Sequence, residues 1–163
     1  MANLEGRSAL VTGGGSGIGR ACSLLLAYEA ARITIGDIRD AAAAKTVAMV
    51  REAGGEASAL HCDIGDEAQV AALTAAAVRT YGGVDILVAN AGISTRAPLH
   101  ELSLEDWERV LRVNLTGTFL CARAAVRQML GQGRGGSIVT IGSVQSVVIS
   151  GSGAASYKAS KGG

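Results

Sequence analysis

Short runs rich in β-branched residues alternate with helix-patterned segments along the whole chain, and this alternation restricts the possible folds more than any other feature. The predicted strands are SALVTG (8–13), RITIGD (32–37), ASALHCD (57–63), VDILVANAG (84–92) and GSIVTIGS (136–143). The run at 84–92 is apolar almost throughout, as expected for a strand whose two faces are both covered. Strict alternation of strands and helices predicts an α/β fold with a doubly wound parallel sheet.

The segments between these strands have helical periodicity. The predicted helices cover 17–30, about 41–53, 66–83, 103–114 and 115–130, and a last one starts near residue 155. Asp66 and Gly82 are typical of the first and last positions of a helix. In the first helix, the apolar residues Ile18, Cys22, Leu25 and Leu26 share one face, which is predicted to face the core.

Composition favours a single domain over residues 1–163. Hydrophobic residues make up 48% and charged residues 18% of the 163, which is typical of a globular protein. A net charge of +1 argues against a nucleic-acid or anionic-membrane partner, and no apolar run is long enough to cross a bilayer. Three cysteines in apolar or helical surroundings are expected to be reduced thiols, which predicts a cytoplasmic location.

A glycine-rich turn, TGGGSGIGR (12–20), joins the first predicted strand to the first predicted helix. Glycines there let the backbone turn sharply and approach a pyrophosphate, which a helix N-terminus attracts. The spacing is Gly13-x-x-x-Gly17-x-Gly19, and the turn predicts a dinucleotide site.

Asp37 ends the second strand, 18 residues beyond Gly19. A carboxylate there can accept both ribose hydroxyls of NAD and would repel the 2′-phosphate of NADP, so NAD is the favoured cofactor. Arg39 is the nearby basic residue that leaves NADP as the second choice, and Asp37 could also be an ordinary turn residue. Asp63 ends the third strand, where its carboxylate could reach the adenine amino group or cap the following loop.

With this turn, the NAG of residues 90–92, Asn114, Ser143 and the YKASK of residues 157–161, the chain resembles the single-domain branch of the short-chain dehydrogenase/reductase family. The resemblance covers the whole chain. It implies a Rossmann-type fold and an NAD(P)-dependent oxidoreductase that acts on a secondary alcohol or ketone. The cofactor-binding residues that it implies are Gly13, Ser16, Gly17, Ile18, Gly19, Asp37, Asp63, Ile64, Asn90, Ala91, Gly92, Tyr157 and Lys161.

The same resemblance implies a catalytic set of Asn114, Ser143, Tyr157 and Lys161. A phenol is a weak base at neutral pH, and a lysine one helical turn away stabilises its ionised form. Tyr157 would therefore move the proton, Lys161 would support it and bind the nicotinamide ribose, and Ser143 would orient the reacting oxygen. Ser146 is a weaker candidate for that serine, and Asn114 either holds a lysine-linked water or caps a helix.

Several expectations concern the whole protein. At ~30 residues for each strand–helix unit, roughly 60–100 further residues would complete the family's domain, which leaves the last strands of the fold missing and 136–143 as an apolar edge. A catalytically silent dinucleotide-binding or assembly module is therefore an alternative to the oxidoreductase, and a dehydratase or isomerase is a third.

The resemblance implies a homo-oligomer, a tetramer or dimer, formed through the helix of residues 114–130. His61 and His100 are interpreted as structural, because no metal-ligand spacing surrounds them.

Overall fold

One sheet of five parallel strands organises the molecule, in a computed structural model that describes residues 4–148 and 153–163. The strands are β1 (Ser8–Thr12), β2 (Arg32–Asp37), β3 (Ala57–His61), β4 (Ile86–Ala89) and β5 (Ser137–Thr140). Their order in the sheet is β3-β2-β1-β4-β5. The chain thus builds outward from β1 to β3 and then returns to place β4 on the other side of β1. This is the doubly wound α/β sheet that the sequence predicts.

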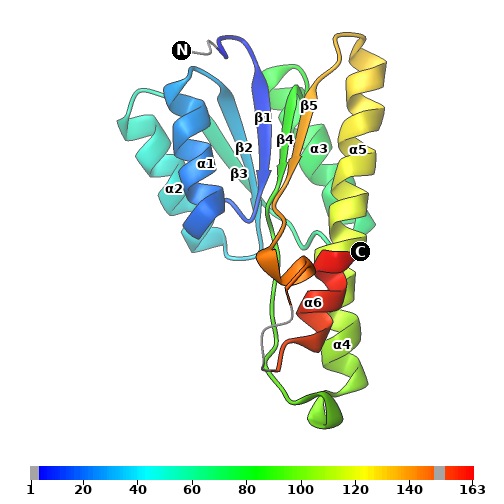
Figure 1. Cartoon of the computed structure of the whole chain (residues 1–163). Coiled ribbons are helices and arrows are strands. Elements are labelled where there is room, and N and C mark those ends of the chain that lie inside the picture. The colour runs from blue at the N-terminus through cyan, green and yellow to red at the C-terminus, as the bar shows by residue number, and fades with distance from the viewer. Residues whose placement is uncertain (1–3, 149–152) are drawn as a thin grey trace.

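Helices cover both faces of the sheet (Figure 1). Helices α1 (Gly17–Tyr28) and α2 (Asp40–Glu52) lie on one face, over a core that includes Val11, Ile33 and Ile35. Helices α3 (Glu67–Tyr81) and α5 (Thr118–Gln132) lie on the other face, over a core that includes Leu10 and Leu87. Helix α3 begins and ends where the sequence predicts, because Asp66 accepts hydrogen bonds from the N–H groups of residues 68 and 69 and Gly82 is left-handed with φ 81°.

Shorter elements lie beyond the carboxyl ends of the strands. They are η1 (Leu99–Glu101), α4 (Leu104–Leu111), η2 (Arg112–Gly117), η3 (Val144–Ser146) and α6 (Ala155–Gly162). Helix α6 packs against α4, against η2, which continues α4, and against η3 (Figure 1).

The core face of α1 is only partly the one predicted, since Cys22 and Leu26 pack against the core but Ile18 and Leu25 do not. Ile18 and Leu25 are 59% and 63% exposed, whereas Gly19 and Ser23 are the buried residues of this helix. Small residues bring the helix close to the sheet, and the Ser23 hydroxyl donates to the carbonyl of Gly19 at 2.9 Å. A pattern of hydrophobic residues cannot reveal a face on which glycine and serine make the contact.

The two helices expected on either side of Asn114 form one continuous helical rod. Between α4 and α5 the chain makes a π-helical turn, η2, whose flanking residues Leu111 and Thr118 both have right-handed helical angles. Asn114 lies inside this turn and is 3% exposed. The helix-cap interpretation of Asn114 is therefore wrong, because no helix begins or ends there.

Strand β5 is an edge of the described sheet, as predicted, since it pairs with β4 and stands last in the strand order. Ile138 and Val139 are 37% and 48% exposed, and Phe119 and Leu130 on the neighbouring α5 are 57% and 76% exposed. Phe119 and Leu130 lie within residues 114–130, the helix through which the homo-oligomer is predicted to form, and that prediction stays a prediction.

At the opposite end of the strands, the buried carboxylate of Asp85 joins three segments. It accepts the Ser8 N–H at 2.9 Å and the Arg134 Nε at 2.7 Å, and Arg7 lies 3.5 Å away. Burial alone would raise the pKa of Asp85, but the hydrogen bonds from Arg134 and Ser8 and the charges of the two arginines together hold it below its usual value. The carboxylate therefore stabilises the fold when it is ionised.

Replacing Asp85 with Asn is expected to lower the free energy of unfolding at pH 7 by about 2 kcal/mol, the range for hydrogen bonds to a charged group. Because the folded pKa lies below the ordinary ~3.9, this contribution is complete above that value and is lost as the pH falls through the folded pKa. Urea unfolding at several pH values measures it. Asp106→Asn is the control, since Asp106 and its partner Arg109 are 41% and 48% exposed. Equal losses in the two variants would contradict this account.

Candidate active site

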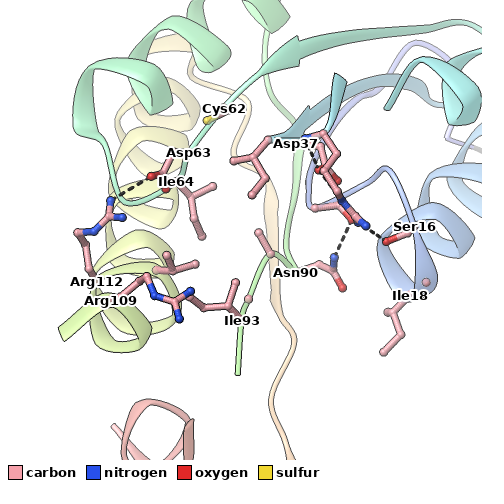
Figure 2. Close-up of a pocket in the computed structure, with 17 residues that line it drawn as sticks. Ser16, Ile18, Asp37, Cys62, Asp63, Ile64, Asn90, Ile93, Arg109 and Arg112 are labelled. Atoms are coloured by element: carbon pink, nitrogen blue, oxygen red, sulfur yellow. Dashed lines mark hydrogen bonds and ion pairs between the residues drawn. The ribbon is translucent and has the colours of Figure 1, made fainter. Parts of the chain in front are cut away.

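A cavity of about 730 Å³ opens at the carboxyl ends of the strands. It lies where β1 and β4 are neighbours and the chain direction across the sheet reverses, which is the position at which open α/β sheets bind ligands. Most of the residues predicted to bind the cofactor line this cavity: Gly13, Ser16, Gly17, Ile18, Asp37, Asp63, Ile64, Asn90, Ala91 and Gly92. Figure 2 shows side chains from the two sides of the sheet pointing into the space between them.

The glycine-rich turn forms one wall. Gly13 and Gly17 have φ values of 65° and 52°, which side chains rarely adopt, so glycine is required for this path of the backbone. The amide of Asn90 donates to the carbonyls of Thr12 at 2.9 Å and Gly13 at 3.2 Å and so fixes the turn against the end of β4. Gly19 does not line the cavity, because it packs directly beneath the turn against Gly13 and Asn90.

Asp37 stands at the end of β2 with its carboxylate fixed on both oxygens. Oδ2 accepts the Gly15 N–H and Oδ1 accepts the Arg39 N–H, each at 2.9 Å. The residue is 5% exposed and yet lines the cavity. The Arg39 side chain lies with its Nε 3.7 Å from Asp37 Oδ1 and donates to Ser16 Oγ at 2.6 Å. Arg39 is thus engaged by two groups of the site itself.

The opposite wall comes from the loop after β3 and from η2. Asp63 Oδ1 accepts the Gly65 N–H at 2.9 Å, so the loop-capping role considered for this aspartate is present. Its Oδ2 is 3.0 Å from Arg112 Nη1. Cys62 also lines this side, and burial, with Asp63 and Asp66, raises the pKa of its thiol to about 11, which keeps it protonated at neutral pH.

The predicted catalytic residues Asn114, Ser143, Tyr157 and Lys161 are not among those that line the cavity, but they lie on elements that contact one another. Lys161 Nζ donates to the carbonyl of Ile141, just beyond β5, at 2.6 Å. Tyr157 lies on the same helix, α6, and is partly buried. Ser143 caps η3, where its hydroxyl accepts the Gln145 N–H at 3.2 Å, and η3 packs on α6. The hydroxyl of Ser146, the weaker candidate, is turned back to the Ser143 carbonyl at 2.6 Å.

Asn114 connects α6 to the segment after β4. Its side-chain oxygen accepts the Ile93 N–H and its Nδ2 donates to the Ile93 carbonyl, both at 2.8 Å. The same Nδ2 donates to Ser160 Oγ at 3.0 Å, and that hydroxyl donates to the carbonyl of Tyr157 at 2.7 Å. The buried amide thus sets the position of the helix that carries Tyr157 and Lys161.

Sequence reasoning missed part of the cavity lining. The additional lining residues are Ile38, Cys62, Ile93, Arg109, Arg112 and Val113, with Arg39 noted only as a basic neighbour. The helix next to Asn114 carries three of these residues, because Arg112 and Val113 follow Arg109 by three and four positions. This spacing places both of them on the same helix face as Arg109. That spacing was the available signal.

Residues 4–148 and 153–163 contain no cluster of three histidine, cysteine or acidic side chains able to hold a metal ion. No helix within them is long and apolar enough to span a membrane.

A nucleotide-sized cavity at the switch point of a doubly wound sheet, with a glycine-rich turn and an acidic strand end, defines a dinucleotide-binding Rossmann fold. The family model for short chain dehydrogenases matches residues 7–163, and the chain belongs to this family.

Known relatives agree with this assignment. A cis-4-hydroxycyclohexanecarboxylate dehydrogenase from Sinomonas cyclohexanicum is 43% identical over 158 residues, covering 96% of this chain and 62% of the relative. An uncharacterized oxidoreductase from Thermotoga maritima is 41% identical over 160 residues, covering 98% of this chain and 62% of the relative. The crystal structure of an NAD⁺-bound xylitol dehydrogenase superposes with a TM-score of 0.92 at 38% identity, covering 98% of this chain and 61% of that one. The chain therefore spans about three fifths of the length of these relatives.

Proposed function

We propose that the protein is an NAD(H)-dependent oxidoreductase that interconverts a secondary alcohol and a ketone, with residues 1–163 as its dinucleotide-binding part. The observation that carries the proposal is the carboxylate of Asp37, fixed by two N–H donors at the end of β2 and facing the cavity beside the glycine-rich turn. A carboxylate in this position accepts ribose hydroxyls and disfavours a 2′-phosphate. NADP remains the second choice.

The residues present fit a nicotinamide dinucleotide. The N-terminus of α1 opens on the turn, and the Ser16 side chain makes no cap, so the first N–H groups of the helix can receive a pyrophosphate. Asp63 and Ile64 would line the adenine pocket, and Asn90, Ala91 and Gly92 would lie beside the nicotinamide half. The bound cofactor would supply hydride transfer.

The chain's own residues would handle the proton and the geometry. Tyr157 would exchange a proton with the substrate oxygen, and Lys161 would favour the ionised phenol and hold the nicotinamide ribose. Ser143 would hydrogen-bond the same substrate oxygen. Asn114 would keep α6 in place through Ile93 and Ser160, the contacts described above.

The relatives suggest the class of substrate. A cyclohexane alcohol is in the name of one, and a linear polyol is in the name of another. Both carry a secondary hydroxyl group. We propose the same functional group for this protein, with cyclic alcohols and polyols as the first compounds to test.

Titration of NADH and NADPH against the full-length protein, followed by fluorescence, tests the proposal. We expect the wild type to bind NADH at least about tenfold more tightly than NADPH, which corresponds to a difference in binding free energy of about 1.4 kcal/mol. Asp37→Ala should weaken NADH binding and remove most of that preference, because the ribose hydroxyls lose their acceptor.

Asp40→Ala is the matched control, because Asp40 lies three residues on, is 74% exposed and pairs with His61 away from the cavity lining. It should leave the preference intact. NADPH binding as tight as NADH binding in the wild type, with no response to Asp37→Ala, would contradict the assignment of NAD.

A further inference from the structure

The guanidinium of Arg112 forms part of the cavity wall that faces Asp37 and Ser16 across the open space (Figure 2). Arg112 Nη1 lies 3.0 Å from Asp63 Oδ2 in an ion pair whose side chains are 48% and 31% exposed. Ion pairs this exposed contribute little to folding stability. The pair joins two residues that are 49 positions apart in the sequence. Because it adds little to folding stability, we expect its role to lie in the cavity that both residues line.

Asp63 is held at three points. Its Oδ1 accepts the Gly65 N–H, its own N–H donates to Gln69 Oε1 at 2.9 Å, and Arg112 holds its Oδ2. The first two contacts fix the backbone and one oxygen, so Arg112 is the group that sets the direction of the second oxygen. Without it, the carboxylate could rotate toward solvent.

The loop around Asp63 is shaped to receive this guanidinium. A Cβ atom on Gly65 would stand 2.5 Å from Arg112 Nη1 and 3.2 Å from its Cζ, so the absent side chain leaves the space that the guanidinium fills. At the other end of η2, a Cβ on Gly117 would stand 2.7 Å from Cγ1 of Ile64. The π-helical turn thus docks on the loop at both of its ends.

We propose that Arg112 is a positioning residue that aims the Asp63 carboxylate at the 6-amino group of the cofactor's adenine. This inference rests on the proposed function. An amino group donates and a carboxylate accepts, so a fixed carboxylate distinguishes adenine from a purine with a 6-oxo group, which presents an acceptor there instead. Arg112 acts on that distinction through Asp63 and without touching the amino group itself.

The test compares two dissociation constants, for NADH and for its deamino analogue, reduced nicotinamide hypoxanthine dinucleotide, with the full-length protein. The wild type should bind NADH about tenfold more tightly, as expected for one hydrogen bond to a charged group. Arg112→Gln should reduce this ratio to about twofold, mainly by weakening NADH binding. Gly65→Ala should have the same effect, because its Cβ displaces the guanidinium while the charge remains.

Arg109→Gln is the matched control. Arg109 lines the same cavity from the same helix face, but its guanidinium pairs with Asp106 at 2.6 Å. Removing its charge should change the binding of both dinucleotides by the same factor and leave their ratio unchanged. Thermal unfolding of each variant should show only small shifts, which separates a loss of recognition from a loss of fold.

The outcomes separate the inference from the proposed function. If the wild type binds neither dinucleotide, the proposed function fails and the inference with it. If NADH binds but Arg112→Gln keeps the wild-type ratio, or weakens both ligands equally, Arg112 has no role in aiming Asp63 and the inference alone is overturned. If Arg112→Gln does not fold, Gly65→Ala decides between the same results.

Discussion

Replacing Tyr157 with Phe is expected to lower kcat by about 10²- to 10⁴-fold, the usual contribution of a positioned acid–base group. Only the hydroxyl is removed, while the ring and its place on α6 are kept. Since Asn114 and Ser160 hold this helix through backbone and side-chain contacts that do not involve the phenol oxygen, NADH binding should change little. Steady-state rates with the best alcohol from a panel of cyclic alcohols and polyols, together with NADH titration, measure the two effects separately.

The control for this prediction is the same substitution at Tyr28, which is 77% exposed on α1 and lies outside the cavity lining. Tyr28→Phe should leave kcat and NADH binding at their wild-type values. A Tyr157→Phe variant that retains most of its activity would remove Tyr157 from the proton transfer. The dehydratase, isomerase or silent-module alternatives would then regain weight.

The fold was predictable because its signals are local. Alternating strand and helix patterns each depend on a few neighbouring residues, and the helix limits at Asp66 and Gly82 depend on single side chains. The glycine-rich turn and Asp37 were found for the same reason. A turn that needs a left-handed backbone between a strand and a helix requires glycine there, and the glycine is visible in the sequence.

Other parts of the fold and of the site depend on contacts between distant parts of the chain. Asp85 meets residues 77 and 49 positions away, and Asp63 meets Arg112 across 49 positions. No single sequence indicates such pairings, because each partner alone has the appearance of an ordinary polar or charged residue. The π-helical turn at Asn114 is equally hidden, since its sequence has the periodicity of two ordinary helices.

Gly19→Ala is expected to abolish measurable NADH binding and to destabilise the fold by about 1–3 kcal/mol, the usual cost of overpacking a close contact. An added Cβ would collide with the Gly13 carbonyl and stand 2.5 Å from Nδ2 of Asn90. Neither group can yield cheaply, because the first is backbone and the second holds the turn through the carbonyls of residues 12 and 13. The turn itself must therefore move, and with it the wall on which the pyrophosphate would rest.

The same substitution at Gly131 should raise the free energy of unfolding instead of lowering it. Gly131 lies near the end of α5, and apart from its own helix backbone and chain neighbours no atom of the described residues stands within 4 Å of the position of a Cβ, so alanine should stabilise the protein by about 0.5–1 kcal/mol through its greater preference for helix. Urea unfolding and NADH titration of both variants complete the comparison. NADH binding that survives Gly19→Ala would mean that the turn can shift without losing the cofactor. The rigid wall formed by Gly13, Gly19 and Asn90 would then be no requirement for binding.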